Sequence, residues 1–278
     1  MTSFGERVRA ALETSGPLCV GIDPHTALLQ EWGLDASAAG AREFGLRVVE
    51  AAAGAVGIVK PQVSFFERYG SGGIAALEDV LAAGRAAGLV VIADAKRGDI
   101  GTTMDAYSDA WLTPGAPLEA DAVTANPFLG VGSLTPAFDL AEAHGKGVFV
   151  LAATSNPESF APQRARLEDG STVSARIVAE VCERNAARIT AGEWAGLGFV
   201  IGATVTWPDA GLSPFSPAAP ILAPGFGRQG AGPEDLHRFG SHMPNVIASE
   251  SRSILSAGPD GIGEAVSRRA EEYRRIRG

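Results

Sequence analysis

The sequence predicts a (β/α)₈ barrel, and three observations support this fold class. Eight short runs of apolar or β-branched residues recur along the chain, each bounded by Gly, Pro or polar residues. Mostly helical, Ala-rich segments separate these runs, and alternation on this scale is typical of a closed parallel barrel. An open doubly wound sheet usually has fewer strands, and no GxGxxG turn follows the first run.

The eight runs are predicted strands because they are nearly continuously apolar, as in a parallel sheet that is covered on both faces. Their ranges are Leu18–Asp23, Gly57–Gln62, Val90–Lys96, Asp121–Asn126, Val148–Thr154, Gly198–Thr204, Pro220–Gly225 and Asn245–Ser251. No linker rich in Pro, Ser or charge divides the chain. Residues 1–278 are therefore expected to form one barrel domain with an N-terminal helix.

Helices are predicted between the strands and at both ends of the chain. Ser3 and Glu6 have the spacing of a capping box, and apolar residues at helical spacing follow them. Residues 72–88 have one apolar helical face, with Gly88 placed as the C-cap. The last helix is expected at about Ile262–Arg277.

Two long segments have an irregular pattern. Asn156–Ser171 is polar, and Trp207–Pro220 is rich in Pro. Each follows a predicted strand, and in barrels the loops that follow the strands form the face that carries active sites. Both segments are therefore expected on that face.

Composition excludes several classes of protein. The formal net charge of −9 argues against a nucleic-acid binder, which normally has a basic surplus. The chain has no apolar run of about 18 residues and no signal peptide, so we expect no membrane partner. Cys19 and Cys182 are isolated, which disfavours a zinc site or a disulfide framework and fits a reducing cytoplasm.

The basic residues are unevenly divided, because Lys60, Lys96 and Lys146 are the only lysines among many arginines. Lys60 and Lys96 lie at the ends of the second and third predicted strands, whereas Lys146 is expected on the ordinary surface. A compact ammonium can stabilise a developing negative charge and deliver a proton, which a guanidinium does poorly. The first two lysines are therefore candidates for chemistry.

Polar residues concentrate at the carboxyl ends of six predicted strands. They are Asp23, Lys60, Asp94, Lys96, Asn126, Thr154, Ser155, Ser251 and Arg252. A barrel gathers these ends into one mouth. A single Asp after a strand is more often a helix N-cap, but capping does not readily explain six strands at once. His25, beside Asp23, is expected to be structural.

The segment ADAKRGDIGTT is the most informative. Asp94 and Lys96 are two residues apart on a strand, so their side chains are expected on the same side. Asp99 lies in the loop that follows, and one ammonium can contact both carboxylates. A structural salt bridge is the alternative interpretation of this cluster.

A second candidate site follows the seventh and eighth predicted strands, where many barrels bind phosphate. Gly225 and Gly227 in APGFGRQG let the backbone approach an anion closely. Arg252 in ASESRSI can bind two phosphate oxygens. The alternative is a tight turn with a surface arginine.

Taken in order, the segments VGIDP, VKPQVSFFERYG, DAKRGDIGTT, ANPFLG, LAATSNP, APGFGRQGA and SRSIL resemble the orotidine 5′-phosphate decarboxylase family, specifically its longer bacterial branch. The similarity spans nearly the whole chain. It implies a (β/α)₈ barrel that forms homodimers. It also implies conversion of orotidine monophosphate to UMP and CO₂ with no metal or organic cofactor.

The resemblance implies a role for each matching residue. Asp23 and Lys60 resemble the ribose-contacting and charge-network residues of the first two strands, and Asp94 and Lys96 resemble the catalytic carboxylate and ammonium. Asp99 matches an aspartate that family members contribute across the dimer interface. Ile100 and Thr103 follow it into the partner's site.

The remaining matches concern the pyrimidine and the phosphate. Ser155 resembles a pyrimidine-contacting serine, and Gln229 and Arg252 resemble phosphate ligands, with Pro224 also expected in the substrate site. Ser251 is expected there too, although shorter family members carry Gly at its place. A further departure is GRQGA, with Arg228, where many members have GAQGG.

Three other functions remain open at this point. A related barrel could use the same Asp-x-Lys-x-x-Asp frame with Mg²⁺ to stabilise an enediolate. A Schiff-base aldolase could use Lys60 or Lys96, but it needs a lysine of depressed pKa, which the flanking carboxylates oppose. The third is a non-catalytic nucleotide-binding barrel, against which the intact charged cluster argues.

Overall fold

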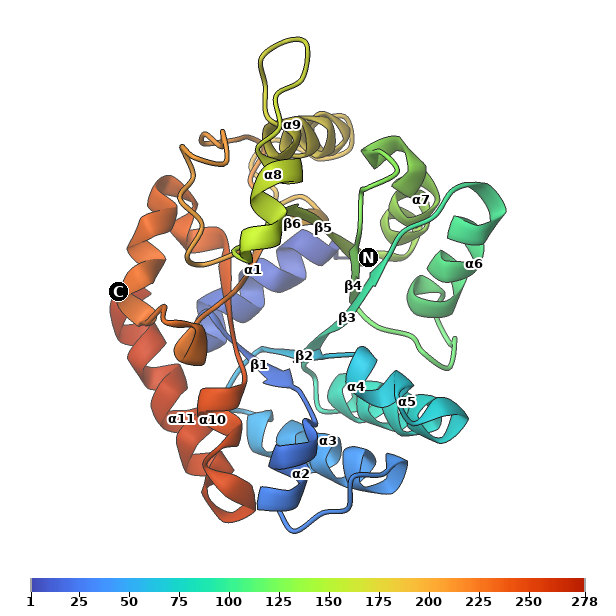
Figure 1. Cartoon of the computed structure of the whole chain (residues 1–278), viewed down its shortest axis with the longest axis vertical. Coiled ribbons are helices and arrows are strands. Elements are labelled where there is room, and N and C mark those ends of the chain that lie inside the picture. Colours follow the sequence, from blue (N-terminus) through green and yellow to red (C-terminus); the bar gives the residue numbers. More distant parts are fainter. Residues whose placement is uncertain (1, 278) are drawn as a thin grey trace.

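The computed structural model describes residues 2–277 and shows a closed barrel of parallel strands (Figure 1). The strands are β1 Leu18–Ile22, β2 Ile58–Pro61, β3 Val90–Arg97, β4 Ala122–Ala125, β5 Gly147–Ala153, β6 Leu197–Ile201, β7 Ile221–Pro224 and β8 Val246–Glu250. They follow one another in sequence order, and β8 pairs with β1 to close the barrel. The predicted fold class is confirmed, and each predicted strand is present within a few residues of its expected ends.

Helices form an outer ring around the barrel (Figure 1). They are α1 Phe4–Ser15, α2 Thr26–Glu31, α3 Ala38–Ala52, α4 Ser64–Glu67, α5 Gly70–Ala86, α6 Gly101–Leu112, α7 Thr135–His144, α8 Phe160–Gln163, α9 Val173–Ala186, α10 Arg252–Leu255 and α11 Gly258–Arg277. Short 3₁₀ segments lie at Val131–Leu134, Pro157–Ser159 and Gly227–Gln229, and a longer 3₁₀ region at Pro233–Asn245 is kinked at Gly240. Within residues 2–277, no helix has both the length and the apolar character needed to cross a membrane.

Helix α1 is the exception, because it is not part of the ring and lies across the amino-terminal end of the barrel (Figure 1). Its buried Phe4, Val8 and Leu12 pack against inward-facing side chains of the strands, including Cys19 and Phe149. The rings of Phe4 and Phe149 meet edge to face, with their centroids 5.8 Å apart. Burying an apolar side chain of this size contributes about 1.5–3 kcal/mol. Helix α1 therefore stabilises the end of the barrel that lies opposite the strand carboxyl ends.

Local contacts fix the position of α1. The hydroxyl of Ser3 accepts a hydrogen bond from the Glu6 N–H, as the predicted cap requires. The Glu6 carboxylate, however, accepts from the Trp194 N–H rather than completing the capping box. A Cβ added to Gly147 at the start of β5 would lie 2.2 Å from the Phe4 ring, so only glycine lets α1 approach this closely.

Lys146 lies in a buried ion-pair network, so the expectation of an ordinary surface position is wrong. The residue is 8% exposed, and its Nζ lies 2.6 Å from Glu119 and 3.9 Å from Asp121. Glu119 also pairs with Arg85 at the end of α5, and Asp121 pairs with Arg7 of α1 at 2.8 Å. The network links α1 to the segments that enter β4 and β5. The position of Lys146 just before a predicted strand does not indicate these partners, because they lie far away in the sequence.

The two irregular segments follow the carboxyl ends of β5 and β6, as expected. Asn156–Ser171 contains α8, which lies at the edge of the barrel mouth (Figure 1). Within Trp207–Pro220, the Phe215 ring stacks on His242 at 4.0 Å, and the Phe215 N–H donates to Nε2 of His242 at 3.0 Å. These contacts hold the second segment against the Pro233–Asn245 region.

The Lys146 network predicts an acid-sensitive contribution to stability from Glu119. Burial by itself raises the pKa of Glu119, but hydrogen bonds from Lys146, the Gly115 N–H and Arg85 lower it from 4.5 to about 2. The stabilising effect of the ionised carboxylate is therefore present above pH 4.5 and is lost as the pH falls toward 2. The substitution Glu119→Gln should lower the free energy of unfolding by about 1 kcal/mol at pH 7.

Urea denaturation of both proteins at a series of pH values measures this difference. It should shrink as the pH falls below 4.5. The variant Glu264→Gln, at an exposed position of α11, is the matched control and should match the parent protein. A difference that stays constant down to pH 2 would contradict the assignment of the effect to the Glu119 charge.

Candidate active site

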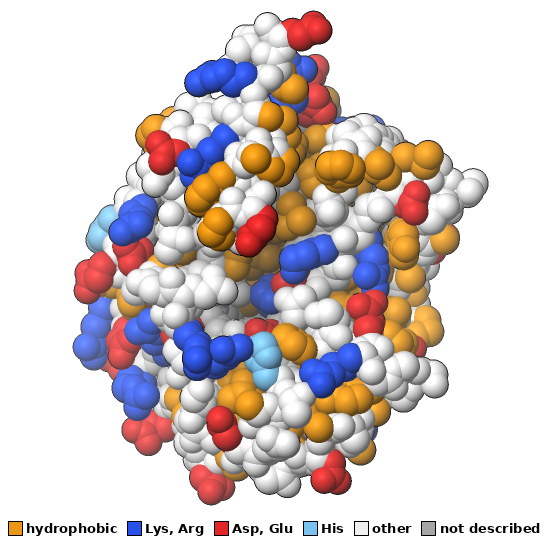
Figure 2. All heavy atoms as spheres, viewed as in Figure 1, with side chains coloured by type: hydrophobic (Ala, Val, Ile, Leu, Met, Phe, Trp, Pro, Cys, Tyr) orange, Lys and Arg blue, Asp and Glu red, His pale blue; other side chains and the backbone are white. Residues whose placement is uncertain are grey.

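A cavity of about 640 Å³ opens at the carboxyl ends of the strands. Eight of the predicted site residues line it: Asp23, Lys60, Asp94, Lys96, Pro224, Gln229, Ser251 and Arg252. Figure 2 looks into this mouth and shows Lys and Arg side chains around a central hollow. Positive charge is therefore gathered locally on a protein whose net charge is −9. Among residues 2–277, no group of three or more His, Cys, Asp and Glu side chains is placed to hold a metal ion.

The buried carboxylate of Asp94 is the centre of a charge network. Its Oδ1 accepts hydrogen bonds from Nζ of Lys96 at 2.6 Å and from the hydroxyl of Thr124 at 2.9 Å. Its Oδ2 accepts from Nζ of Lys60 at 3.0 Å. Lys60 is as deeply buried as Asp94, whereas the Lys96 side chain is 46% exposed. Among these three residues, Lys96 is therefore the one most open to a ligand in the cavity.

The ion pairs keep the buried members of the network charged. Burial by itself raises the pKa of Asp94, but the positive charges of Lys60 and Lys96 and their hydrogen bonds hold it well below its usual range. Burial by itself lowers the pKa of Lys60, but the negative charges of Asp94 and Asp23 raise it above its usual value. A protonated Lys60 is not a nucleophile, which weighs against its use in a Schiff base.

The backbone of β3 departs from regular strand geometry at Lys96. Among residues 2–277, Lys96 is the only non-glycine residue with a positive φ, which is 51°. A side chain in this left-handed region costs about 1–3 kcal/mol. The pairing of β3 with β4 shifts register between Ala93 and Arg97, and the Lys96 N–H donates to the hydroxyl of Thr124 at 2.9 Å. The Asp94 and Lys96 side chains are in contact, as expected. The direction of the Lys96 side chain, however, is set by its left-handed backbone and not by the regular alternation of a strand.

Asp23, just after β1, has a buried oxygen that lacks a partner. Within residues 2–277, no group donates a hydrogen bond to its Oδ1. A buried acceptor left unpaired costs about 1–3 kcal/mol. Asp23 as a residue also lines the cavity, which places its carboxylate in the wall that faces a ligand.

The carboxyl ends of β7, β8 and β1 form a basic corner of the cavity. The turn after β7 has φ values of 114° at Gly225 and 74° at Gly227, which glycine adopts without strain. Arg252 begins α10, and its Nη2 lies 3.1 Å from Nε2 of His25. Arg228 lines the same corner. His25, expected to be structural, is therefore part of the cavity wall.

Comparison with known proteins decides the family. The family model described as "Orotidine 5′-phosphate decarboxylase / HUMPS family" matches residues 16–260. The chain belongs to this family. A Salinispora tropica protein named orotidine 5′-phosphate decarboxylase is 50% identical over 263 residues, which cover 94% of this chain and 93% of the relative. The resemblance predicted from the ordered motifs is thus confirmed.

Further relatives and solved structures agree with this membership. A Streptomyces coelicolor orotidine 5′-phosphate decarboxylase is 48% identical over 280 residues, covering 99% of this chain and 98% of the relative. A crystal structure of a putative orotidine 5′-phosphate decarboxylase from Streptomyces avermitilis has a TM-score of 0.93 at 45% identity. It covers 99% of this chain and 96% of that chain.

Three residues that orotidine 5′-phosphate decarboxylases are expected to place in the partner's site do not line the cavity of their own chain: Asp99, Ile100 and Thr103. Oδ1 of Asp99 accepts a hydrogen bond from the Ile100 N–H at 2.8 Å. Ile100 is 62% exposed, and Thr103 is also exposed. These side chains therefore face outward from a single chain.

Ser155, the predicted pyrimidine contact, does not line the cavity either. It is half-buried, and its Cβ lies 3.4 Å from the position that a Cβ on Gly202 would take. Thr154 lines the cavity in its place. The contact from Ser155 to the pyrimidine stays a prediction from the sequence.

The sequence prediction missed several residues of the cavity wall, including Gln62 and Ser249. Gln62 donates to the Asp94 carbonyl at 3.3 Å. Gln62 lies two residues after Lys60, and Ser249 lies two residues before Ser251. The same-side spacing that relates Asp94 to Lys96 could have found both of them.

The thiols of Cys19 and Cys182 are expected to be unreactive in the native protein. Burial raises the pKa of Cys19 to about 12 and that of Cys182 to about 11. Because the thiolate is the reactive form, neither residue should react with Ellman's reagent at pH 8 on a scale of minutes. Both should react after unfolding in urea, and glutathione in the same buffer is the positive control. Rapid modification of the native protein would contradict the burial of both thiols.

Proposed function

We propose that the chain decarboxylates orotidine 5′-phosphate to UMP and CO₂, with Lys96 as the proton donor. The observation that carries this proposal is the Lys96 ammonium, paired with buried Asp94 and open to the cavity. The names of the relatives identify the substrate, and the charge network provides the chemistry. The absence of a metal or organic cofactor and a cytoplasmic location stay predictions from the sequence.

The cavity offers a separate group for each part of the nucleotide. The phosphate is assigned to Arg252 and Gln229 at the basic corner, because arginine can donate two parallel hydrogen bonds to phosphate oxygens. A ribose hydroxyl is assigned to the carboxylate of Asp23, which lines the cavity. The pyrimidine then lies toward Lys96, with Pro224 and Ser251 along the wall.

Decarboxylation breaks the bond between carbon six of the pyrimidine and its carboxyl group. The electron pair stays on carbon six while CO₂ leaves, and the Lys96 ammonium stabilises this carbanion. A proton then passes from Nζ of Lys96 to carbon six, which yields UMP, and solvent returns a proton to the amine. Asp94 orients the ammonium before the reaction through the hydrogen bond from Nζ of Lys96.

Lys96 alone cannot supply the whole catalytic effect. Two unit charges about 4 Å apart interact by roughly 4 kcal/mol at an effective dielectric constant of about 20. Enzymes typically lower the barrier by about 8–23 kcal/mol. The remainder is assigned to the preorganised network and to binding energy from the phosphate, which is remote from the reacting carbon.

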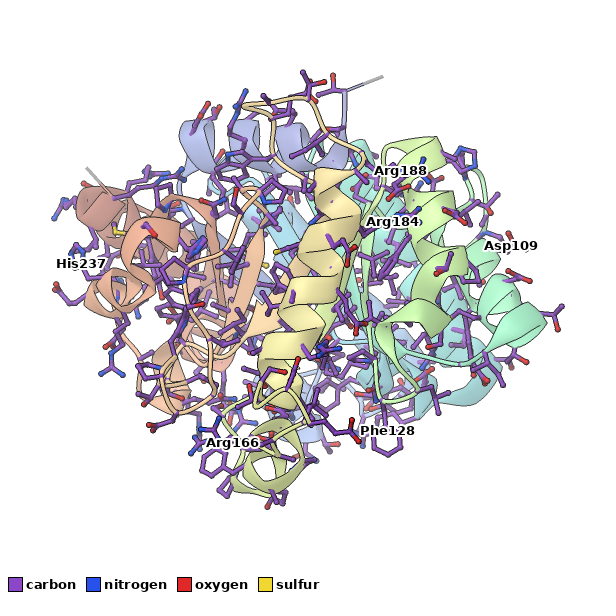
Figure 3. The ribbon with its side chains drawn as sticks, turned by 90° about the horizontal axis from the view of Figure 1, so that it is seen from above. Asp109, Phe128, Arg166, Arg184, Arg188 and His237 are labelled. Atoms are coloured by element: carbon purple, nitrogen blue, oxygen red, sulfur yellow. The ribbon has the colours of Figure 1, made fainter. Side chains whose placement is uncertain are left out.

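We also propose that two copies of the chain share their active sites. Asp99 lies outside the cavity of its own chain, in the loop between β3 and α6. Apolar side chains are exposed on this loop and the next one, with Ile100 62%, Phe128 86% and Leu129 53% exposed. Figure 3 shows Phe128 at the end of the barrel opposite α1. A second copy that covers this surface would bury the apolar groups. It would also bring Asp99 of the first copy close to Lys96 of the second copy.

The reaction is tested by following orotidine monophosphate in the ultraviolet with EDTA present. The parent protein should consume it, and Lys96→Ala should reduce turnover by orders of magnitude while UMP still binds. Lys146→Arg is the matched lysine control and should keep its activity. Near-normal turnover by Lys96→Ala would overturn the assignment. Loss of activity in EDTA would favour the metal-dependent barrel, and trapping by borohydride would favour the Schiff-base aldolase.

The shared site is tested by mixing two inactive variants, Lys96→Ala and Asp99→Ala, under conditions that exchange subunits. In a mixed dimer one site has both substitutions, whereas the other retains both Lys96 and Asp99. Random exchange should therefore restore about a quarter of the parent activity. No recovery, with mixed dimers shown to form, would refute the shared site.

A further inference from the structure

His25 and Arg252 are in direct contact although 227 positions separate them in the chain. Nη2 of Arg252 lies 3.1 Å from Nε2 of His25. A guanidinium carries only hydrogen-bond donors, so this contact requires Nε2 to be the acceptor. The imidazole must then be neutral, with its single proton on Nδ1.

The surroundings of His25 favour this neutral form. Burial and the positive charge of Arg252 lower the pKa of His25, and Arg68 and Arg228 act in the same direction. Asp23 is the charged neighbour that acts in the opposite direction. The imidazole also packs against Phe65, with ring centroids 4.2 Å apart, which limits its rotation.

We propose that His25 is a positioning residue for Arg252: its neutral Nε2 holds the guanidinium at the cavity wall before a phosphate group arrives. This inference rests on the proposed function, in which Arg252 binds the substrate phosphate. Phe65 braces the imidazole, and the imidazole in turn orients the guanidinium.

The benefit of this contact is preorganisation. A free arginine side chain samples many rotamers, and a ligand that must order it binds more weakly. His25 restricts those rotamers without neutralising the guanidinium, which a carboxylate partner would do. The charge of Arg252 therefore stays available for an anion. The predicted consequence is confined to ligands that carry a phosphate.

The first experiment compares the binding of UMP and uridine by calorimetry. His25→Leu removes the acceptor at similar volume and should weaken UMP binding about tenfold while leaving uridine binding unchanged. His25→Gln retains an amide oxygen as acceptor and should stay within about twofold of the parent protein. His237→Leu, at an exposed position that does not line the cavity, is the matched control (Figure 3). Equal losses for UMP and uridine, or equal losses in the Leu and Gln variants, would overturn the proposal.

A double-mutant cycle with Arg252→Ala separates this inference from the proposed function. If His25 acts through Arg252, His25→Leu should have no further effect on UMP binding in the Arg252→Ala protein. A tenfold loss in both backgrounds would overturn the positioning role and leave the phosphate role of Arg252 intact. Unchanged UMP affinity in Arg252→Ala alone would instead refute the phosphate assignment of the proposed function.

Discussion

The candidate site depends on one interaction, the burial of the Asp94 carboxylate between two lysines. Removing a carboxylate from water costs several kcal/mol, and only close cations and hydrogen bonds offset that cost. Lys60, Lys96 and Thr124 supply them from β2, β3 and β4. Because three neighbouring strands contribute, the network forms only when β2, β3 and β4 are paired side by side. The unusual backbone at Lys96 persists for the same reason, since Thr124 and Asp94 hold both its N–H and its ammonium.

The two ends of the barrel have different roles, because one stabilises the fold and the other forms the cavity. At the amino-terminal end, α1 and the Lys146–Glu119 network close and stabilise the fold. At the carboxyl end, the strands stop in polar residues and the cavity stays open. All three lysines of the chain therefore lie in ion pairs with carboxylates that are largely removed from solvent. The small number of lysines in the sequence pointed to residues with buried ion-pair partners. It did not indicate which of these lysines face a ligand.

Much of the barrel could be predicted from local pattern. An apolar run bounded by Gly or Pro forms a strand in almost any parallel barrel, so the strands lie within a few residues of their expected positions. The residues that meet in the mouth could also be predicted, because parallel strands place their carboxyl ends together. Ser155 and Lys146 could not be placed this way. Their surroundings are set by segments far away in the chain, such as the loop at Gly202 and the carboxylate of Glu119.

The sequence by itself determined the barrel, its order of strands and the family, because alternation and ordered motifs are properties of short segments. Only the tertiary structure decided the left-handed backbone of Lys96, the role of Thr124 beside Asp94, and the contact between His25 and Arg252. Each of these depends on the register of neighbouring strands or on the closure of β8 against β1. Barrel closure brings residues from opposite ends of the chain within hydrogen-bonding distance. A local sequence pattern cannot predict such contacts.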